Sequence, residues 1–230
     1  LRLSAPGSQR LLQTPSLEIA VGGAEANVAV SLACLGHVAR LVTTLPDQPL
    51  GRACMAEIRR HGVDVSAVRF VSHGRVGLYF FEAGAGLRPA EVLYDRAGSS
   101  FAHMSAASME WSGVLADADW LHVSGVTPAL GAGPTELTLA ALRAARARGL
   151  RISFDCNYRA KLWQTWGGDA ASILAACAAV ADLLFADERA LAMLLGESSA
   201  RDFATLTARA FATWPALRWN RLLTRPATLS

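Results

Sequence analysis

Apolar positions along the chain change between two kinds of spacing, and this change predicts strands that alternate with helices. Five short apolar runs end at glycine or polar residues, as strands do: residues 17–21, 39–45, 120–124, 152–155 and 183–185. Five longer stretches carry apolar residues at helical spacing: residues 24–35, 49–61, 134–148, 169–180 and 188–195. Strands and helices in this order are typical of an α/β protein with a mostly parallel sheet and helices on both faces.

Residues 68–96 interrupt this order. They contain three short strand-like segments, separated by glycine-rich turns and without helices between them: residues 70–71, 76–81 and 92–94. Parallel strands need long crossover connections, so this hairpin-like region does not easily continue a parallel sheet. We expect a small β lid, formed by residues around 10–21 and 68–96, that belongs to a single domain covering residues 1–230.

The composition is that of a folded globular protein, because 52% of the 230 residues are hydrophobic and only 18% are charged. The net charge is +3, and no acidic residue follows Asp202, whereas Arg209, Arg218, Arg221 and Arg225 lie in this tail. The basic balance is therefore a tail effect and does not predict nucleic-acid binding. No apolar run is long enough to span a bilayer and no signal peptide is recognisable, so we expect a cytoplasmic protein without a membrane partner.

The cysteines and histidines do not predict a metal site. Cys34, Cys54, Cys156 and Cys177 are widely spaced and form no Cys-x-x-Cys pair. Three of them fall within apolar helix or strand patterns, which favours buried free thiols. The histidines form no pair at the spacing of metal ligands, and we assign no metal-binding residue.

The first strand–helix junction is the most informative segment. A strand-like run ends at Gly22-Gly23, and a helix with apolar residues at helical spacing follows. The glycine pair allows the backbone to approach a ligand without an intervening Cβ, and Asn27 in the first helical turn can face a pocket. Taken alone, the pattern is more typical of close helix–sheet packing than of a ligand site.

Two later segments give the junction its context. The string Gly22-Gly23-Ala24-Glu25-Ala26-Asn27-Val28-Ala29, together with Tyr94-Asp95-Arg96 and Asp155-Cys156-Asn157-Tyr158-Arg159, resembles the signatures of the PfkB (ribokinase-like) carbohydrate kinases. The resemblance extends from Leu1 to about Leu195 and is closest to kinases of 2-keto-3-deoxygluconate. It implies a ribokinase-like three-layer α/β/α sandwich with a β lid, and transfer of a phosphoryl group from ATP, with Mg²⁺, to a sugar acid. It also allows a homodimer through the lid.

The resemblance carries over seven substrate-binding residues: Gly23, Asn27, Tyr79, Tyr94, Arg96, Asn157 and Arg159. Their chemistry suits an acidic sugar, because the planar guanidinium groups of Arg96 and Arg159 match a carboxylate. Strand alternation places Tyr94 and Arg96 on one face of the lid. Residues that follow parallel strands can converge at the carboxyl edge of a sheet. Each residue alone has an ordinary structural explanation, and only the set supports the assignment.

The catalytic motif of the resembled family is not recognisable. That motif, Gly-Ala-Gly-Asp, supplies the general base and a helix N-terminus for the phosphates. Three similar strings do not match: residues 84–87 end in Leu87, residues 131–134 contain no acid, and residues 167–169 lack the preceding Gly-Ala. Asp169 is better explained as a helix N-cap. We therefore assign no catalytic residue and expect the chain to be inactive by itself.

A second difference concerns the nucleotide. The resembled family has Asn-x-x-Glu, which helps organise metal and phosphate, where this chain has Asp187-Glu188-Arg189-Ala190. Asp187 and Glu188 are the only candidates for cofactor contact, through water. The chain thus resembles the sugar-binding two-thirds of a kinase that is incomplete at both its N- and C-terminal ends.

Two alternatives remain open from the sequence. The chain can be a non-catalytic sugar-binding module or a degenerate pseudokinase, because the catalytic motif is not found. It can also derive from a kinase for a neutral sugar such as fructose or ribose. A neutral sugar has no carboxylate for the two arginines, so binding of acidic and neutral sugars distinguishes these alternatives.

Overall fold

The computed structural model describes residues 1–197 and 202–217. Arg218, Arg221 and Arg225, to which the sequence analysis attributes much of the positive charge, lie outside the described residues. The chain forms two compact units that meet in sequence between Met104 and Ser105. The expectation of a single domain stays a prediction.

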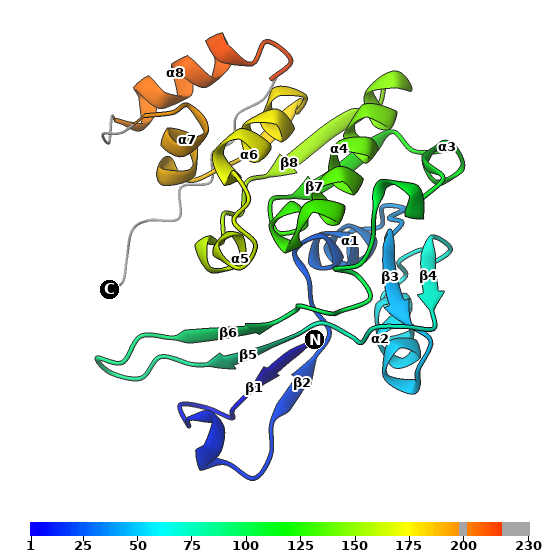
Figure 1. Ribbon diagram of the computed structural model, residues 1–230, viewed down its shortest axis with the longest axis vertical. Helices are drawn as coiled ribbons and strands as arrows, with labels where there is room; N and C mark the ends of the chain where they lie inside the picture. The colour runs from blue at the N-terminus through cyan, green and yellow to red at the C-terminus, as the bar shows by residue number, and fades with distance from the viewer. Residues whose placement is uncertain (198–201, 218–230) are drawn as a thin grey trace. The chain divides into compact units, whose positions relative to one another are not determined.

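The first unit contains a four-stranded sheet, which we call the lid sheet. It consists of β1 (Arg2–Ser4), β2 (Glu18–Ala20), β5 (Leu78–Glu82) and β6 (Glu91–Asp95), in the order β2-β1-β5-β6 (Figure 1). β1 runs antiparallel to β2 and parallel to β5, and β5 runs antiparallel to β6. A short 3₁₀ helix, η1 (Leu11–Gln13), lies between β1 and β2.

Strand register gives the two faces of the lid sheet different chemistry. Leu3 pairs with Ile19 and with Phe80, and Phe80 pairs with Leu93, so these four apolar residues form one row across the sheet. Their sequence neighbours point to the opposite face, because side chains alternate along a strand. There Tyr79 pairs directly with Tyr94.

The first unit also contains a separate parallel pair, β3 (Thr43–Pro46) and β4 (Val68–Val71). The sequence analysis placed residues 68–71 in the lid, and that boundary is wrong, because β4 pairs with β3 and not with a lid strand. The expected lid also omitted β1. The short strand-like segment at 70–71 resembled the neighbouring hairpin strands and carried no signal for its partner.

Two helices of the first unit, α1 (Ala24–Cys34) and α2 (Pro49–Arg59), share a small apolar core. Ala29 of α1 and Ile58 of α2 are buried there with Leu41 and Val63. Proline at the first position of α2 suits a helix start, because an N–H group at this position would have no hydrogen-bond partner within the helix. Gly36 follows α1 with φ +86°, the left-handed conformation that the sequence predicts for a helix end.

The second unit is built on a parallel sheet of β7 (Trp120–Ser124), β8 (Arg151–Asp155) and β9 (Leu183–Phe185), in that order. The central strand β8 is buried on both faces, as expected of a parallel sheet covered by helices. The helices of this unit are α3 (Trp111–Val114), α4 (Ala132–Ala147), α5 (Ala160–Gln164), α6 (Ala170–Ala179), α7 (Glu188–Leu194) and α8 (Phe203–Thr213), with short 3₁₀ helices η2 (Ala106–Ser108) and η3 (Pro128–Leu130).

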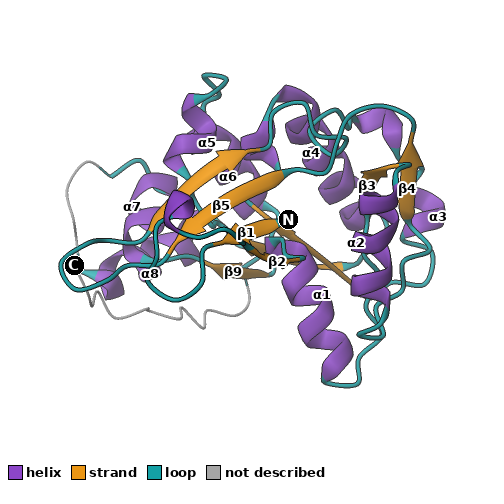
Figure 2. Ribbon diagram, turned by 90° about the horizontal axis from the view of Figure 1, so that it is seen from below, coloured by secondary structure: helices purple, strands orange, loops and turns teal. Residues whose placement is uncertain are grey.

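Helix α4 packs against β7 and β8, while α6 packs against α7 and α7 against α8 (Figure 1). Figure 2 colours these helices and strands by type. Aspartate side chains cap three helices: Asp169 at α6, Asp187 at α7 and Asp202 at α8. The predicted N-cap role of Asp169 is therefore confirmed.

The predicted α/β class is confirmed, with parallel strands in both units. Helices α3, α5 and α8 were not predicted. The first two are single turns of four and five residues, too short for a periodic pattern to appear. Cys54, Cys156 and Cys177 are buried free thiols, whereas Cys34, which lies within the predicted helix 24–35, is exposed, so the expectation of burial is wrong for Cys34. Across the part of the chain that the structure describes, no helix has both the length and the apolarity to cross a bilayer.

Candidate functional site

The glycine bend joins β2 to α1 and is closed by Asn27. Gly23 has extended backbone angles and is the N-cap of α1. Its carbonyl accepts from the Asn27 N–H at 2.8 Å, and its own N–H donates to Asn27 Oδ1 at 3.5 Å. The Asn27 side chain therefore lies over the bend, where it can reach both the backbone and a ligand.

Gly22 leaves open a space between the lid strand β5 and the start of α1. A methyl group on Gly22 would lie 3.6 Å from Asn27 Oδ1 and 4.0 Å from the Tyr79 hydroxyl oxygen. The lid strand β5 thus brings a phenol group to the start of α1. The sequence identified Gly22 only as part of a motif. That its backbone lies exposed between the Asn27 and Tyr79 side chains depends on the tertiary fold and could not be predicted from the motif.

Arg96 lies over two aromatic rings of the lid sheet. Its guanidinium carbon is 5.1 Å from the ring centroid of Tyr94 and 5.6 Å from that of Tyr79. The two rings are 6.3 Å apart and tilted by 45°. Distances within about 6 Å are those of cation–π contacts. The prediction that Tyr94 and Arg96 share a face is confirmed.

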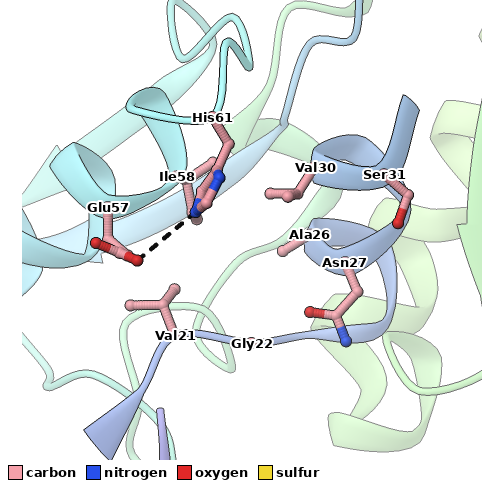
Figure 3. Close-up of a pocket in the computed structure, with 9 residues that line it drawn as sticks. All are labelled: Val21, Gly22, Ala26, Asn27, Val30, Ser31, Glu57, Ile58 and His61. Carbon is pink, nitrogen blue, oxygen red and sulfur yellow. Dashed lines mark ion pairs between the residues drawn. The ribbon is translucent and has the colours of Figure 1, made fainter. Parts of the chain in front are cut away.

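A pocket of about 290 Å³ lies between α1 and α2, next to the bend (Figure 3). Glu57 of α2 and His61, which follows the end of α2 by two residues, stand on one side, with His61 Nε2 3.7 Å from Glu57 Oε1, and Asn27 stands on the other. The remaining lining residues are Val21, Gly22, Ala26, Val30, Ser31 and Ile58. The sequence analysis missed Glu57 and His61. Their spacing on one helix face gave no signal that the face borders the bend.

Asn157 and Arg159 lie in the second unit, just beyond the carboxyl end of β8. Asn157 has φ +36°, and among the described residues it alone has a positive φ without being glycine. Such a conformation costs about 1–3 kcal/mol and is common at functional sites. Asp155 supports it, because Asp155 Oδ1 accepts from the Asn157 N–H at 3.1 Å. Arg159 is the N-cap of α5 and donates from Nη1 to the Tyr158 carbonyl at 3.0 Å.

Cys156, which precedes Asn157 in the chain, and Gly125 are buried. The Cys156 thiol has its pKa raised to about 12, first by burial and then by the negative charges of Asp155 and Asp187. The backbone there is tightly packed, since a methyl group on Gly125 would lie 2.1 Å from the Cys156 carbonyl oxygen. This close packing holds the carboxyl ends of β7 and β8 in place.

Asp187 and Glu188, the candidates for cofactor contact, lie at the start of α7. Asp187 Oδ1 accepts from the Ala190 N–H at 2.7 Å, so this carboxylate serves as a helix cap. Within residues 1–197 and 202–217, no group of three or more histidine, cysteine, aspartate or glutamate side chains could hold a metal ion.

Comparison with known proteins places this chain in a family. Residues 3–218 match the family described as pfkB family carbohydrate kinase. The chain belongs to that family, as its resemblance implied.

Several characterised relatives act on sugar acids. The chain is 37% identical over 195 residues to a 2-dehydro-3-deoxygalactonokinase of Haloferax volcanii. The aligned region covers 85% of this chain and 60% of that protein. It is 33% identical over 144 residues to a 2-dehydro-3-deoxygluconokinase of Bacillus subtilis, covering 62% of this chain and 44% of that protein. A fructokinase of Klebsiella pneumoniae is 32% identical over 192 residues, which cover 83% of this chain and 58% of the fructokinase.

Solved structures share the fold. A 2-dehydro-3-deoxygluconokinase from Thermotoga maritima is 36% identical with a TM-score of 0.86, over 93% of this chain and 65% of that one. A PfkB family carbohydrate kinase from Listeria grayi is 34% identical with a TM-score of 0.85, and the match covers 94% of this chain and 66% of that one. The ribokinase-like α/β fold is thereby confirmed. The chain spans between 44% and 60% of the length of the three relatives named above and about two thirds of these structures.

The structure thus gathers five of the seven predicted substrate-binding residues in the first unit: Gly23, Asn27, Tyr79, Tyr94 and Arg96. The other two, Asn157 and Arg159, share the segment after β8 in the second unit. Their role in binding stays a prediction.

Proposed function

We propose that this chain is the sugar-binding part of a carbohydrate kinase whose substrate is a 2-keto-3-deoxy sugar acid, with 2-keto-3-deoxygluconate as the first choice. The observation that carries the proposal is the position of Arg96 over the rings of Tyr79 and Tyr94 on one face of the lid sheet. On this face the Tyr79 hydroxyl group lies near the Gly22 bend. A guanidinium beside exposed backbone and an amide side chain offers one group for a carboxylate and others for hydroxyls.

Each side chain has a defined task in this proposal. Arg96 and Arg159 bind the carboxylate, because a planar guanidinium can donate two parallel hydrogen bonds to it. Asn27 and Asn157 each donate to one sugar oxygen and accept from a hydroxyl. Gly23 lets the backbone approach the hydroxyls without a Cβ in the way. The relatives named for 2-dehydro-3-deoxy sugar acids support this choice of substrate class.

The second substrate of the complete enzyme would be ATP, with Mg²⁺, whose role is to supply and neutralise the transferred phosphoryl group. The described residues offer no metal site, and the sequence contains no Gly-Ala-Gly-Asp string. We propose that the chain alone binds sugar and does not phosphorylate it. An assay with ATP, Mg²⁺ and 2-keto-3-deoxygluconate should detect no turnover, and turnover above background would contradict this.

Calorimetry with 2-keto-3-deoxygluconate tests the proposed binding. The expected affinity is millimolar or tighter, and Arg96→Ala should weaken it at least tenfold, because a charge-assisted pair is worth about 1.5–3 kcal/mol. Arg69→Ala is the matched control, since Arg69 is an exposed strand arginine on β4. No binding by a folded chain, or equal loss in both variants, would overturn the assignment.

A neutral sugar is the alternative substrate, and the fructokinase relative keeps it in view. The same calorimetry with fructose distinguishes the two. If the acid is the substrate, fructose should bind more weakly than the acid, and Arg96→Ala should not change its affinity. Tighter binding of fructose than of the acid would favour a neutral-sugar kinase.

We also propose that the apolar row of the lid sheet is the contact surface of a homodimer. Ile19 and Leu93 of this row are 66% and 47% exposed, and Leu3 and Phe80 lie between them. A second copy related by a two-fold axis presents the same row and buries it. Light scattering should give a dimer that Ile19→Lys dissociates, while Leu87→Lys, in the exposed β5–β6 turn, should leave it intact. A monomeric wild-type chain would contradict this proposal.

A further inference from the structure

We propose that the rings of Tyr79 and Tyr94 are positioning groups that hold the Arg96 guanidinium ready for a carboxylate. The inference rests on the proposed function for the identity of the ligand. It assigns the two tyrosines a task beyond lining the site, which is to fix the orientation of the arginine by their ring faces. We call the two rings the tyrosine clamp.

Strand pairing builds the clamp. Tyr79 of β5 and Tyr94 of β6 are direct partners across the antiparallel pair, so both rings stand on one face of the lid sheet. Arg96 follows Tyr94 by two residues, and its side chain returns over this same face. The guanidinium carbon then lies 5.1 and 5.6 Å from the two ring centroids.

Gly77 lies beside the arginine stem. A methyl group on Gly77 would lie at ordinary contact distances, 3.8 Å from Arg96 Cγ and 3.4 Å from Ser99 Cβ, so the backbone borders the stem without crowding it. The contacts that restrict the arginine are those of its guanidinium group with the two rings. A guanidinium group in contact with two rings keeps fewer rotamers than one that extends into solvent.

This arrangement favours carboxylate binding for a physical reason. A flexible arginine loses rotamer freedom when it binds a ligand, and that loss weakens the affinity. A guanidinium that already lies over aromatic rings has lost part of this freedom before a ligand binds. The clamp should therefore strengthen the binding of an acid more than the binding of a neutral sugar.

The two tyrosines differ in one respect. The Tyr79 hydroxyl oxygen lies near the Gly22 bend, at 4.0 Å from the position of an added methyl group, so Tyr79 can also contact the sugar. Removing the hydroxyl from Tyr94 should therefore have less effect than removing it from Tyr79. Removing either ring should weaken the hold on Arg96.

The test compares ring removal with hydroxyl removal. Calorimetry with 2-keto-3-deoxygluconate should give Tyr94→Phe an affinity within about twofold of wild type and Tyr94→Leu a loss of about five- to tenfold, in the range of cation–π contacts. The affinity for fructose should fall by a smaller factor than the affinity for the acid in Tyr94→Leu, because fructose has no carboxylate for Arg96. Equal affinities of Tyr94→Leu and Tyr94→Phe, or equal losses in both, would overturn the clamp.

A measurement without ligand separates this inference from the proposed function. In a nitrogen-15 NMR spectrum, the Arg96 Nε–H resonance should be displaced by the ring currents, and it should move toward the unstructured arginine position in Tyr94→Leu but not in Tyr94→Phe. Arg96→Lys identifies the resonance. An unmoved resonance would overturn the clamp, whereas absent sugar binding with a displaced resonance would overturn only the proposed function.

Discussion

Tyr79 directs its hydroxyl group to the backbone at Gly22, although 57 residues of sequence separate them. A methyl group on Gly22 would lie 4.0 Å from this oxygen and 3.6 Å from Asn27 Oδ1, which are ordinary contact distances. The lid sheet and the start of α1 thus border one small space, and that space is open only because residue 22 has no side chain.

Gly22→Ala tests whether this space receives a ligand. The methyl group meets no atom closer than 3.6 Å, so the midpoint of urea unfolding should match that of wild type. Affinity for 2-keto-3-deoxygluconate should fall about tenfold, because the methyl group occupies volume that the sugar needs. Unchanged affinity would show that the sugar does not approach Gly22.

Gly125→Ala should destabilise the second unit. Its methyl group would lie 2.1 Å from the Cys156 carbonyl oxygen and 2.8 Å from Leu174 Cδ2, so the backbone must shift. We expect a loss of about 3 kcal/mol in the free energy of urea unfolding, as in overpacked cores. Gly149→Ala is the control: no atom lies within 4 Å, but φ is +73°, and strain alone should cost about 1 kcal/mol. Equal losses would contradict the close packing at Gly125.

Asp187 should behave as a helix cap. Asp187→Ala removes the acceptor of the Ala190 N–H and should cost about 1 kcal/mol of unfolding free energy. Asp187→Asn keeps a capping oxygen and should cost much less. If both variants have the stability of wild type, the cap does not contribute, and a role in nucleotide contact becomes the better explanation for this residue.

Buried thiols should make the chain less stable in alkali. Burial raises the pKa of Cys156 and of Cys177 from an ordinary value of 9.0 to about 12. The folded state therefore retains these protons where the unfolded state loses them. The stabilisation is complete below pH 9.0 and is lost as the pH rises toward about 12.

Urea unfolding at a series of pH values measures this effect. The free energy of unfolding should fall by roughly 1 kcal/mol per thiol for each pH unit above the ordinary pKa. Thiol reagents should label the exposed Cys34 rapidly and the buried Cys156 and Cys177 only after unfolding. Rapid labelling of all the cysteines in the native chain would contradict their burial.

Much of the fold could be predicted from periodicity and capping residues. The helices at α1, α2, α4 and α6 and the strands at β7 to β9 have strong local signals, such as Pro49 at a helix start and Gly36 and Gly149 after helix ends. The partner of β4 could not be predicted in this way. Strand pairing depends on contacts far apart in sequence, and residues 68–71 carry no local mark that distinguishes a lid strand from a central one.

The candidate site likewise has some features that the local sequence predicts and others that depend on contacts far apart in sequence. Alternation alone placed Tyr94 and Arg96 on one face, because Arg96 directly follows β6 and two residues so close in sequence need no tertiary information. The contact of Arg96 with Tyr79 depends on the β5–β6 register, and the pocket contribution of Glu57 and His61 depends on how α2 packs beside α1. The positive φ of Asn157 also has no sequence signal, since asparagine occupies many conformations.

A crystal structure of the chain with 2-keto-3-deoxygluconate tests the central claim most directly. We expect the sugar carboxylate within hydrogen-bond distance of the Arg96 guanidinium group, and the hydroxyls beside Gly23 and Asn27. An acid bound elsewhere, or bound at the bend while Arg96 points away from it, would contradict the account.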